Sequence, residues 1–135
     1  MTTAIVTYQG GLRTKSVHVD SQQEIITDAP KDNEGNGMAF SPTDLLSSAL
    51  ASCMLTIMGI IANRHQLNIE GTTAQVTKIM GNNPRRVIEI VVNVKFNQDF
   101  DTKNRILLEN AALTCPVAES LHPAIKQTIS FAYGH

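Results

Sequence analysis

Aromatic residues are scarce in this 135-residue chain, which has no tryptophan, two tyrosines and four phenylalanines. A hydrophobic core must therefore be assembled from aliphatic side chains and methionine. The formal net charge is only −1 and no run of like charges is present. These features give no electrostatic reason to expect binding to nucleic acid or to an anionic membrane. The length allows one hydrophobic core, so we expect residues 1–135 to form a single domain.

Targeting and cofactor signatures are also missing. The chain does not start with the basic segment and long apolar stretch of a secretory signal, and we expect a cytoplasmic protein. Residues 45–62 carry no charge over nearly the length of a membrane span, but serine, threonine and glycine interrupt them. We therefore expect a buried core helix there and no membrane span. No phosphate-binding glycine loop and no closely spaced Cys or His pair is present, so we expect neither a cofactor nor a metal.

What is present is a regular succession of strand and helix patterns. Three short β-branched runs come first, and the turn-rich residues 28–37 are expected to form a surface loop. Ser41-Pro42-Thr43-Asp44 then has the residue types of a helix start, with Ser as the N-cap. Apolar residues at three- and four-residue spacing continue the helix to about Arg64.

The second half of the chain alternates in the same way. Residues 68–80 and 87–96 are strand candidates, and the turn residues between them predict an antiparallel hairpin. Asp101 is expected to cap a second helix, Cys115-Pro116 to open a short helical turn, and residues 125–133 to form a closing strand. The order βββ-α-ββ-α-(α)-β predicts an α+β fold.

The two cysteines occupy different surroundings. Cys53 lies within the long helix beside Ala51 and Ser52, whose small side chains would let another element or an apolar molecule approach the sulfur. It is too far from the helix start to gain from the helix dipole. Cys115 precedes Pro116 and fits a helix N-cap, where exposed backbone N–H groups favour a thiolate. Either thiol could instead be inert core filler.

A thiolate at Cys53 needs a cation, and only Arg13, Lys15 and Lys31 precede it. Arg13 follows the Gly10-Gly11 turn at a strand end, from which its side chain could fold over the central helix. A guanidinium stays protonated and can hold a thiolate and a peroxide oxygen together through its forked donors. The alternative is a solvated surface charge.

Two motifs match one family in residue type and spacing. Residues 40–53, which run from Phe40-Ser41-Pro42 to Ala51-Ser52-Cys53, contain a Pro-x-x-Leu helix start that leads to Ala-x-Cys. The second motif is Thr114-Cys115-Pro116-Val117. With the similar opening at residues 3–11, the whole chain resembles the OsmC/Ohr family (osmotically inducible protein C and organic hydroperoxide resistance). The resemblance implies an OsmC-like fold with antiparallel sheets wrapped around a long central helix, and an intertwined homodimer with active sites at the subunit interface.

The resemblance also implies a thiol peroxidase reaction in oxidative stress defence. Cys53 would attack a peroxide and become a sulfenic acid, and Cys115 would then condense with it to a disulfide. A dithiol reductant, often lipoyl-linked in this family, would reduce the pair again. Organic hydroperoxides are the expected substrates, with hydrogen peroxide as a further one, because small and aliphatic residues surround Cys53.

Two positions depart from the family pattern. The family usually has a Glu directly after the helix-start Pro, and this Glu orients a catalytic Arg. Here Thr43 holds that place and Asp44 comes one residue later, which turns a helical side chain by about 100°. The family's Gly-Gly-Arg is lengthened by Leu12, so Arg13 comes one residue late. The candidate catalytic residues are Cys53, Cys115 and Arg13, with Asp44 and Thr43 as possible supporting residues.

Other functions stay open at this point. A redox-sensing protein or a small-molecule-binding module could keep the same fold without peroxidase activity. A purely structural dimer would require both cysteines to be inert.

Overall fold

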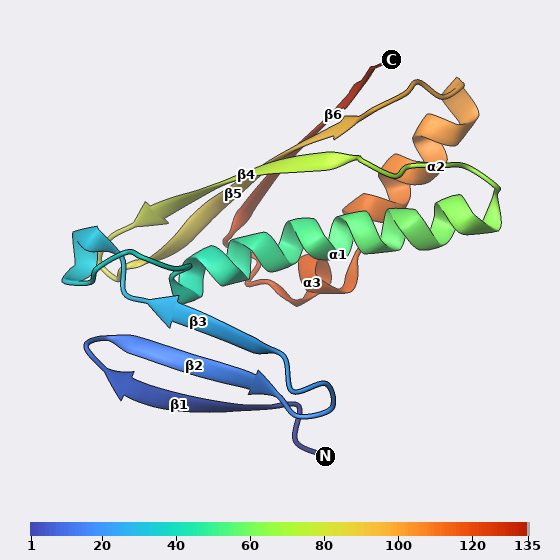
Figure 1. Ribbon diagram of the computed structural model, residues 1–135. Helices are drawn as coiled ribbons and strands as arrows, with labels where there is room; N and C mark the ends of the chain where they lie inside the picture. Colours follow the sequence, from blue (N-terminus) through green and yellow to red (C-terminus); the bar gives the residue numbers. More distant parts are fainter. Residues whose placement is uncertain (135) are drawn as a thin grey trace. The chain divides into compact units, whose positions relative to one another are not determined.

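Strands and helices follow the predicted order along residues 1–134, which the computed structural model describes (Figure 1). The elements are β1 (Ala4–Gly10), β2 (Arg13–His18), β3 (Glu24–Asp28), the 3-10 turn η1 (Lys31–Asn33), α1 (Pro42–Arg64), β4 (Thr73–Gly81), β5 (Arg86–Phe96), α2 (Thr102–Leu113), α3 (Pro116–Ser120) and β6 (Lys126–Tyr133). The chain divides into two compact units, residues 1–45 and 46–135. The division falls in the first turn of α1, and each unit is described by itself.

The first unit is built on the antiparallel sheet β1-β2-β3. Its β1–β2 turn contains Gly10, Gly11 and Leu12, all with positive φ. The turn thus absorbs the extra residue Leu12, and Arg13 is the first residue of β2. The cross-strand register pairs Arg13 with Asp28. Asp28 therefore ends β3 and is buried, whereas we expected it in a surface loop.

The two faces of this sheet differ in charge. The register places Val6 and Ile25 on one face, which carries no Asp, Glu, Lys or Arg side chain. The charged residues of the three strands lie on the opposite face; they are Arg13, Lys15, Glu24 and Asp28. Val6 is 62% exposed and Ile25 is 49% exposed. The uncharged face therefore exposes apolar side chains among polar residues such as Thr14 and Ser16.

Helix α1 begins with a capping box. The Ser41 hydroxyl accepts a hydrogen bond from the Asp44 backbone N–H at 3.0 Å, and Asp44 Oδ2 accepts one from the Ser41 N–H at 2.9 Å. This reciprocal pair satisfies two backbone donors at the helix start. The predicted helix bounds are confirmed, and Asp44 stabilises the start of α1 through this capping box.

The second unit contains the mixed sheet β4-β5-β6. β4 and β5 form the predicted antiparallel hairpin, but β6 pairs with β5 in parallel. The expectation of wholly antiparallel sheets is therefore wrong for this pair. The reason is that α2 and α3 form a crossover, which returns the chain to the end of the sheet where β5 began. β4 starts at Thr73, later than predicted, because residues 68–72 form a turn in which Gly71 has a φ of 82°.

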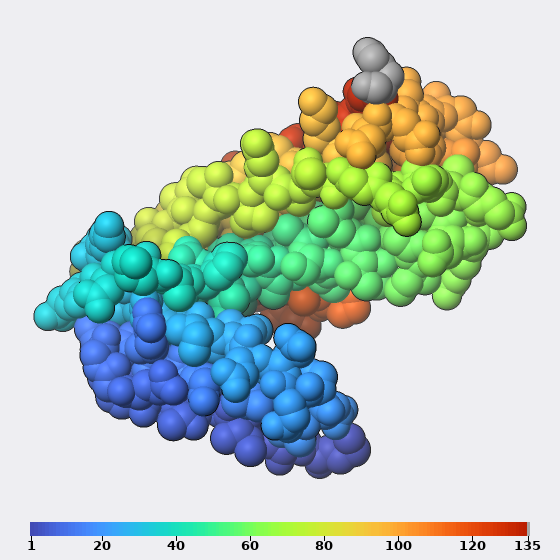
Figure 2. Space-filling view, in the orientation of Figure 1, coloured from blue at the N-terminus to red at the C-terminus, as the bar shows by residue number. Residues whose placement is uncertain are grey.

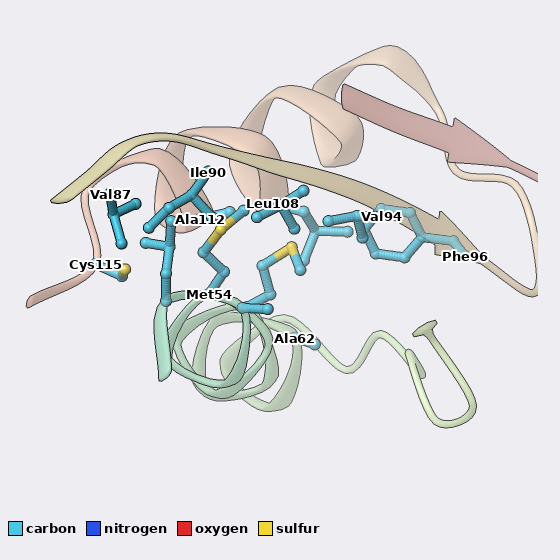
Figure 3. Close-up of a cluster of buried hydrophobic side chains, with 13 residues drawn as sticks. Met54, Ala62, Val87, Ile90, Val94, Phe96, Leu108, Ala112 and Cys115 are labelled. Atoms are coloured by element: carbon cyan, nitrogen blue, oxygen red, sulfur yellow. The ribbon is translucent and has the colours of Figure 1, made fainter. Parts of the chain in front are cut away.

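One side of α1 supplies much of the hydrophobic core of this unit (Figure 3). Leu50, Met54 and Met58 are fully buried together with core residues from β5 and α2; these are Val87, Ile90, Val92, Val94, Phe96, Leu108 and Ala112. Complete burial of one large aliphatic side chain contributes about 1.5–3 kcal/mol. α1 is also long and apolar enough to cross a membrane by length and composition. Core helices pass the same test, and 33% of this apolar window is buried in the described residues.

The side of α1 that faces away from this core stays exposed. It includes Ala49, Thr56 and Ile60, which are spaced along one face of the helix. Figure 2 shows helix surface (green) on the outside of the unit. α1 therefore has apolar surface on both sides, and its own unit covers only one of them.

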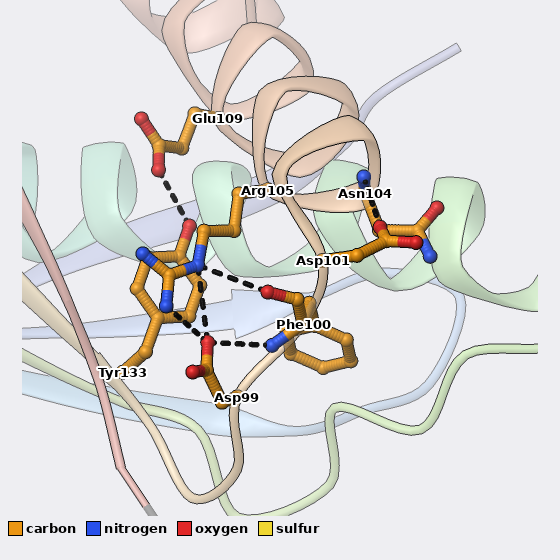
Figure 4. Close-up of polar contacts among 7 residues, drawn as sticks. All are labelled: Asp99, Phe100, Asp101, Asn104, Arg105, Glu109 and Tyr133. Atoms are coloured by element: carbon orange, nitrogen blue, oxygen red, sulfur yellow. Dashed lines mark hydrogen bonds and ion pairs between the residues drawn. The ribbon is translucent and has the colours of Figure 1, made fainter.

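A polar and aromatic cluster joins the end of β6 to α2 (Figure 4). The Tyr133 hydroxyl donates a hydrogen bond to Glu109, and the Arg105 guanidinium lies 4.2 Å from the centroid of the Tyr133 ring. Arg105 also bonds to Asp99. Burial, followed by the hydrogen bond to Glu109, raises the pKa of Tyr133 far above its usual range. Tyr133 therefore stays protonated and holds β6 against α2.

Candidate functional site

Cys53 lies near the middle of α1 and is half-buried. Its side chain packs at the border of the core, next to the exposed side of the helix. On that side, the Thr56 hydroxyl donates a hydrogen bond to the Ser52 carbonyl at 2.8 Å. Ser52 and Thr56 both lie within one helical turn of Cys53. The position leaves the sulfur accessible while the core fixes the helix that carries it.

Cys115 lies at the junction of α2 and α3 and is completely buried. As predicted, it is the N-cap of α3, with Pro116 at the first helical position. Its Sγ accepts a hydrogen bond from the Ala118 backbone N–H at 3.4 Å. Ala118 is tied in turn to β6, because its carbonyl accepts a hydrogen bond from Gln127 Nε2. The sulfur is therefore held in place by both its helix and the neighbouring strand.

The two thiols meet in the second unit. Burial raises the pKa of Cys115, and the neighbouring Cys53 side chain raises it further. The N–H of Ala118 acts in the opposite direction but does not outweigh burial. The expectation that the N-cap position would favour a Cys115 thiolate is therefore wrong, because the desolvation of a charged sulfur costs more than one N–H bond returns.

Arg13 forms a forked ion pair with Asp28 inside the first unit. Arg13 Nε donates to Asp28 Oδ1 at 2.7 Å, and Nη2 donates to Oδ2 at 2.8 Å. Asp28 Oδ2 also accepts a hydrogen bond from the Met38 N–H at 3.1 Å. The hydrogen bond from Arg13 lowers the pKa of Asp28, although burial opposes the shift. The same hydrogen bond raises the pKa of Arg13, so the pair is fully charged at neutral pH.

The remaining candidates lie at the start of α1. Thr43 contacts the Ser41 hydroxyl at 3.2 Å, and Asp44 completes the capping box with Ser41. The structure thus brings Cys53 and Cys115 together and pairs Arg13 with an acid that the sequence interpretation missed. The strand register could have identified Asp28 as the partner of Arg13. A β2–β3 hairpin that pairs Val17 with Glu24 also pairs Arg13 with Asp28 four residues further along the ladder.

Groups that could bind a metal are not apparent in the described part of the chain. Within residues 1–134, no three His, Cys, Asp or Glu side chains gather closely enough to hold a metal ion.

Comparisons with known proteins find the same fold in other chains. A protein of Psychrobacter arcticus 273-4, named for osmotic stress induction and a detoxification response, is 57% identical, with a TM-score of 0.95 over 97% of this chain and 96% of that chain. An OsmC-like protein from Mycoplasma pneumoniae is 18% identical, with a TM-score of 0.81 over 98% of this chain and 96% of that one. An organic hydroperoxide resistance protein OsmC from Legionella pneumophila is 17% identical, with a TM-score of 0.72 over 98% of each chain.

A search of curated proteins gave no significant match. The family model described as OsmC-like protein matches residues 34–130, a range that includes both cysteines and all of α1. With this match and the identity to the Psychrobacter protein, the chain belongs to the OsmC-like protein family.

Proposed function

We propose that the protein is a thiol-dependent peroxidase that reduces organic hydroperoxides, and hydrogen peroxide as a further substrate, in oxidative stress defence. The observation that carries the proposal is the proximity of the Cys53 and Cys115 side chains, which is close enough for Cys53 to raise the pKa of Cys115. Two thiols that already meet can form a disulfide with little rearrangement of the backbone. The family and the name of the Legionella relative, an organic hydroperoxide resistance protein, lend further support.

The proposed reaction proceeds in two steps at these sulfurs. The Cys53 thiolate attacks the hydroperoxide, the O–O bond breaks, and the organic alkoxide takes up a proton and leaves as an alcohol. Cys53 is then a sulfenic acid. The Cys115 sulfur attacks the Cys53 sulfur, and the sulfenic hydroxyl leaves as water with the Cys115 proton, which completes the disulfide. A dithiol reductant such as a lipoyl group restores both thiols and leaves as its own disulfide.

The raised pKa of Cys115 supports this division of roles. A thiol that stays protonated is a weak nucleophile toward peroxide, so Cys53 is the sulfur that attacks first. Cys115 stays reduced beside it until the sulfenic acid forms. Arg13, which stays charged beside Asp28, is the residue to which the family resemblance gives the role of stabilising a Cys53 thiolate.

A cavity beyond Cys53 along α1 is the proposed place for the organic part of the substrate. It has a volume of about 590 Å³ and lies in the second unit between α1 and the α1–β4 connection. Its lining is mixed. The apolar residues are Leu55, Gly59, Ile60, Ala62, Leu67 and Ile69, and the polar ones are Thr56, Asn63, Asn68, Glu70 and Thr72. An aliphatic or aryl group would contact the apolar part of this lining.

A second copy of the chain is the proposed partner. The uncharged face of the first unit and the exposed side of α1 both carry exposed apolar side chains, among them Val6, Ile25 and Ile60. A homodimer would bury surface of this kind. We assign the protein to the cytoplasm, where thiols are kept reduced.

Stopped-flow oxidation of the reduced protein tests the proposal. Cumene hydroperoxide should oxidise the wild type rapidly, Cys53→Ser should abolish the reaction, and Cys115→Ser should allow Cys53 oxidation without a disulfide. Mass spectrometry after limited peroxide should find a Cys53–Cys115 bond in the wild type. Equal rates for the wild type and Cys53→Ser would contradict peroxidase activity and would leave a binding or sensing role.

The cavity gives a sharper test of substrate class. A Cβ added at Gly59 meets no heavy atom within 4 Å, so a larger side chain fits there without strain and projects into the cavity. Gly59→Leu should raise KM for cumene hydroperoxide and leave the rate with hydrogen peroxide unchanged. Gly59→Ala is the matched control, because it makes the same change to helix propensity and adds only a methyl group.

A further inference from the structure

Gln127 is a polar residue on the side of β6 that faces the hydrophobic core. The parallel register places Gln127 beside Ile90 and Ile129 beside Val92, and both partners on β5 are completely buried. Positions of this kind usually carry apolar side chains, and a polar group there needs a hydrogen-bonding partner. The contacts of Gln127 therefore indicate why a glutamine occupies this position.

The partner of Gln127 is Ala118 in α3. Gln127 Nε2 donates a hydrogen bond to the Ala118 carbonyl at 3.1 Å. The backbone N–H of Ala118 donates a hydrogen bond to Cys115 Sγ at 3.4 Å. Ala118 is thus bonded on one side to β6 and on the other to the Cys115 sulfur, and all three residues belong to the second unit.

α3 depends on such contacts for its position. It is only five residues long, Pro116–Ser120, and a helix of this length is marginal in isolation. A displacement of Ala118 would carry with it the N–H group that holds the Cys115 sulfur. The hydrogen bond from Gln127 therefore limits how far that sulfur can move from its neighbour Cys53.

We propose that Gln127 is a positioning residue for disulfide formation, because it holds Ala118 and, through it, the Cys115 sulfur. The inference rests on the proposed function, in which the Cys115 sulfur attacks the Cys53 sulfenic acid and water leaves. That attack competes with a second hydroperoxide, which would transfer an oxygen to the sulfenic acid, form a sulfinic acid and leave as an alcohol. Gln127 thus increases the share of oxidised Cys53 that ends as a disulfide.

Gln127→Met gives the first test. Methionine suits a core-facing position but has no N–H donor for the Ala118 carbonyl. Oxidation of Cys53 by cumene hydroperoxide should keep its wild-type rate. Formation of the Cys53–Cys115 disulfide should slow by about tenfold or more, because small misplacements of reacting groups cause rate losses of this order. At high peroxide, mass spectrometry should find more Cys53 sulfinic acid than in the wild type.

Ser130→Ala is the matched control. The Ser130 hydroxyl donates a hydrogen bond to Asn93 Oδ1 at 2.6 Å, a contact that also starts from β6 but is exposed. Its removal should leave both steps at wild-type rates. Urea denaturation of both variants measures stability alongside. A Gln127→Met protein that is less stable and slowed equally in both steps would overturn the inference and make the contact merely structural.

A disulfide reagent probes the same geometry without peroxide. The Cys53 thiolate attacks dithiobis(nitrobenzoic acid) and releases one thionitrobenzoate, and the Cys115 thiolate then attacks the Cys53 sulfur of the mixed disulfide and releases the second. Gln127→Met should slow the second release by about tenfold or more and leave the first unchanged. Equal rates of second release in Gln127→Met and the wild type would overturn the inference.

The two readouts separate this inference from the proposed function. A wild type that does not reduce cumene hydroperoxide, together with a slower second release in Gln127→Met, would contradict the proposed function and support the positioning role. An active wild type, with disulfide formation and second release unchanged in Gln127→Met, would overturn the positioning role alone.

Discussion

The two units of the chain are stabilised in opposite ways. In the second unit, buried side chains of α1, β5 and α2 form a continuous apolar core. In the first unit, the buried residues are Thr27, Asp28 and Ser41, all of them polar, and no hydrophobic residue among residues 1–45 is buried. The first unit thus depends on backbone pairing and polar contacts, and a three-stranded sheet without a covered apolar face is marginal in water.

The candidate catalytic groups are divided between these two units. The sulfurs are placed in the unit with its own core, where packing can hold them in contact. The guanidinium and its acid are placed in the unit without one, where a charged fork can be held by hydrogen bonds alone. The apolar face of the first unit is then available for a partner.

The largest expected effect comes from the core of the second unit. Leu50→Ala should lower the free energy of unfolding by about 2–5 kcal/mol, because the lost side chain leaves a cavity. Urea denaturation followed by circular dichroism measures the change. Ile106→Ala on the exposed surface of α2 is the control and should change stability by less than about 1 kcal/mol. Similar losses in both variants would contradict the assigned core.

The next effect concerns the uncharged face of the first unit. Val6→Glu should raise the dissociation constant of the proposed homodimer at least about tenfold, because it places a charge on the face assigned to the partner copy. Ile5→Glu is closely matched, since Ile5 is 60% exposed on the neighbouring position but lies on the opposite, charged face. Analytical ultracentrifugation compares the two. Dissociation by Ile5→Glu alone would assign the interface to the other face.

A smaller effect is expected where the two units join. Ser41→Ala removes the hydroxyl that caps α1 and should cost about 0.5–2 kcal/mol of stability. Ser48→Ala, farther along the same helix, serves as the control. Hydrogen exchange should show faster exchange for the first turn of α1 in Ser41→Ala only. Unchanged exchange there would mean that the capping box does not stabilise the helix start.

The smallest effect is the pH dependence of the stability of the first unit. The pKa of Asp28 is lowered in the folded chain, so folding favours its ionised form. This contribution is fully present above the ordinary carboxyl pKa of about 4 and is lost as the pH falls through the lower folded value. The stability difference between the wild type and Asp28→Asn should therefore shrink below about pH 4. Hydrogen exchange of the β2 and β3 amides measures it, and a difference independent of pH would contradict the charged pair.

Most of the fold could be predicted because its signals are local. The cap residues at Ser41 and Asp101, the helical spacing before Arg64 and the turn before Arg86 each determine an element on their own. The parallel pairing of β6 could not be predicted in the same way. It depends on how the α2–α3 crossover packs, and this contact between distant segments leaves no periodic pattern in residues 125–133.

Prediction of the candidate site from the sequence has the same limit, because contacts between distant segments decide part of it. The spacing of the motifs pointed to Cys53 and Cys115, and the structure brings these thiols together. The protonation of Cys115 depends on complete burial by distant elements, which its place before Pro116 does not reveal. The turn residues Pro30 and Gly35 predict a loop that begins at Asp28. In the structure, Asp28 is the last residue of the β2–β3 ladder and pairs with Arg13.

The contact between the two thiols has a thermodynamic consequence for the choice of reductant. Thiols that the fold holds together have a high effective concentration for each other, and this favours the disulfide and lowers its reduction potential. Each 1.4 kcal/mol of such preference corresponds to about 30 mV. In the proposed reaction, the proximity that favours the Cys53–Cys115 disulfide would therefore also require a strongly reducing dithiol to reverse it.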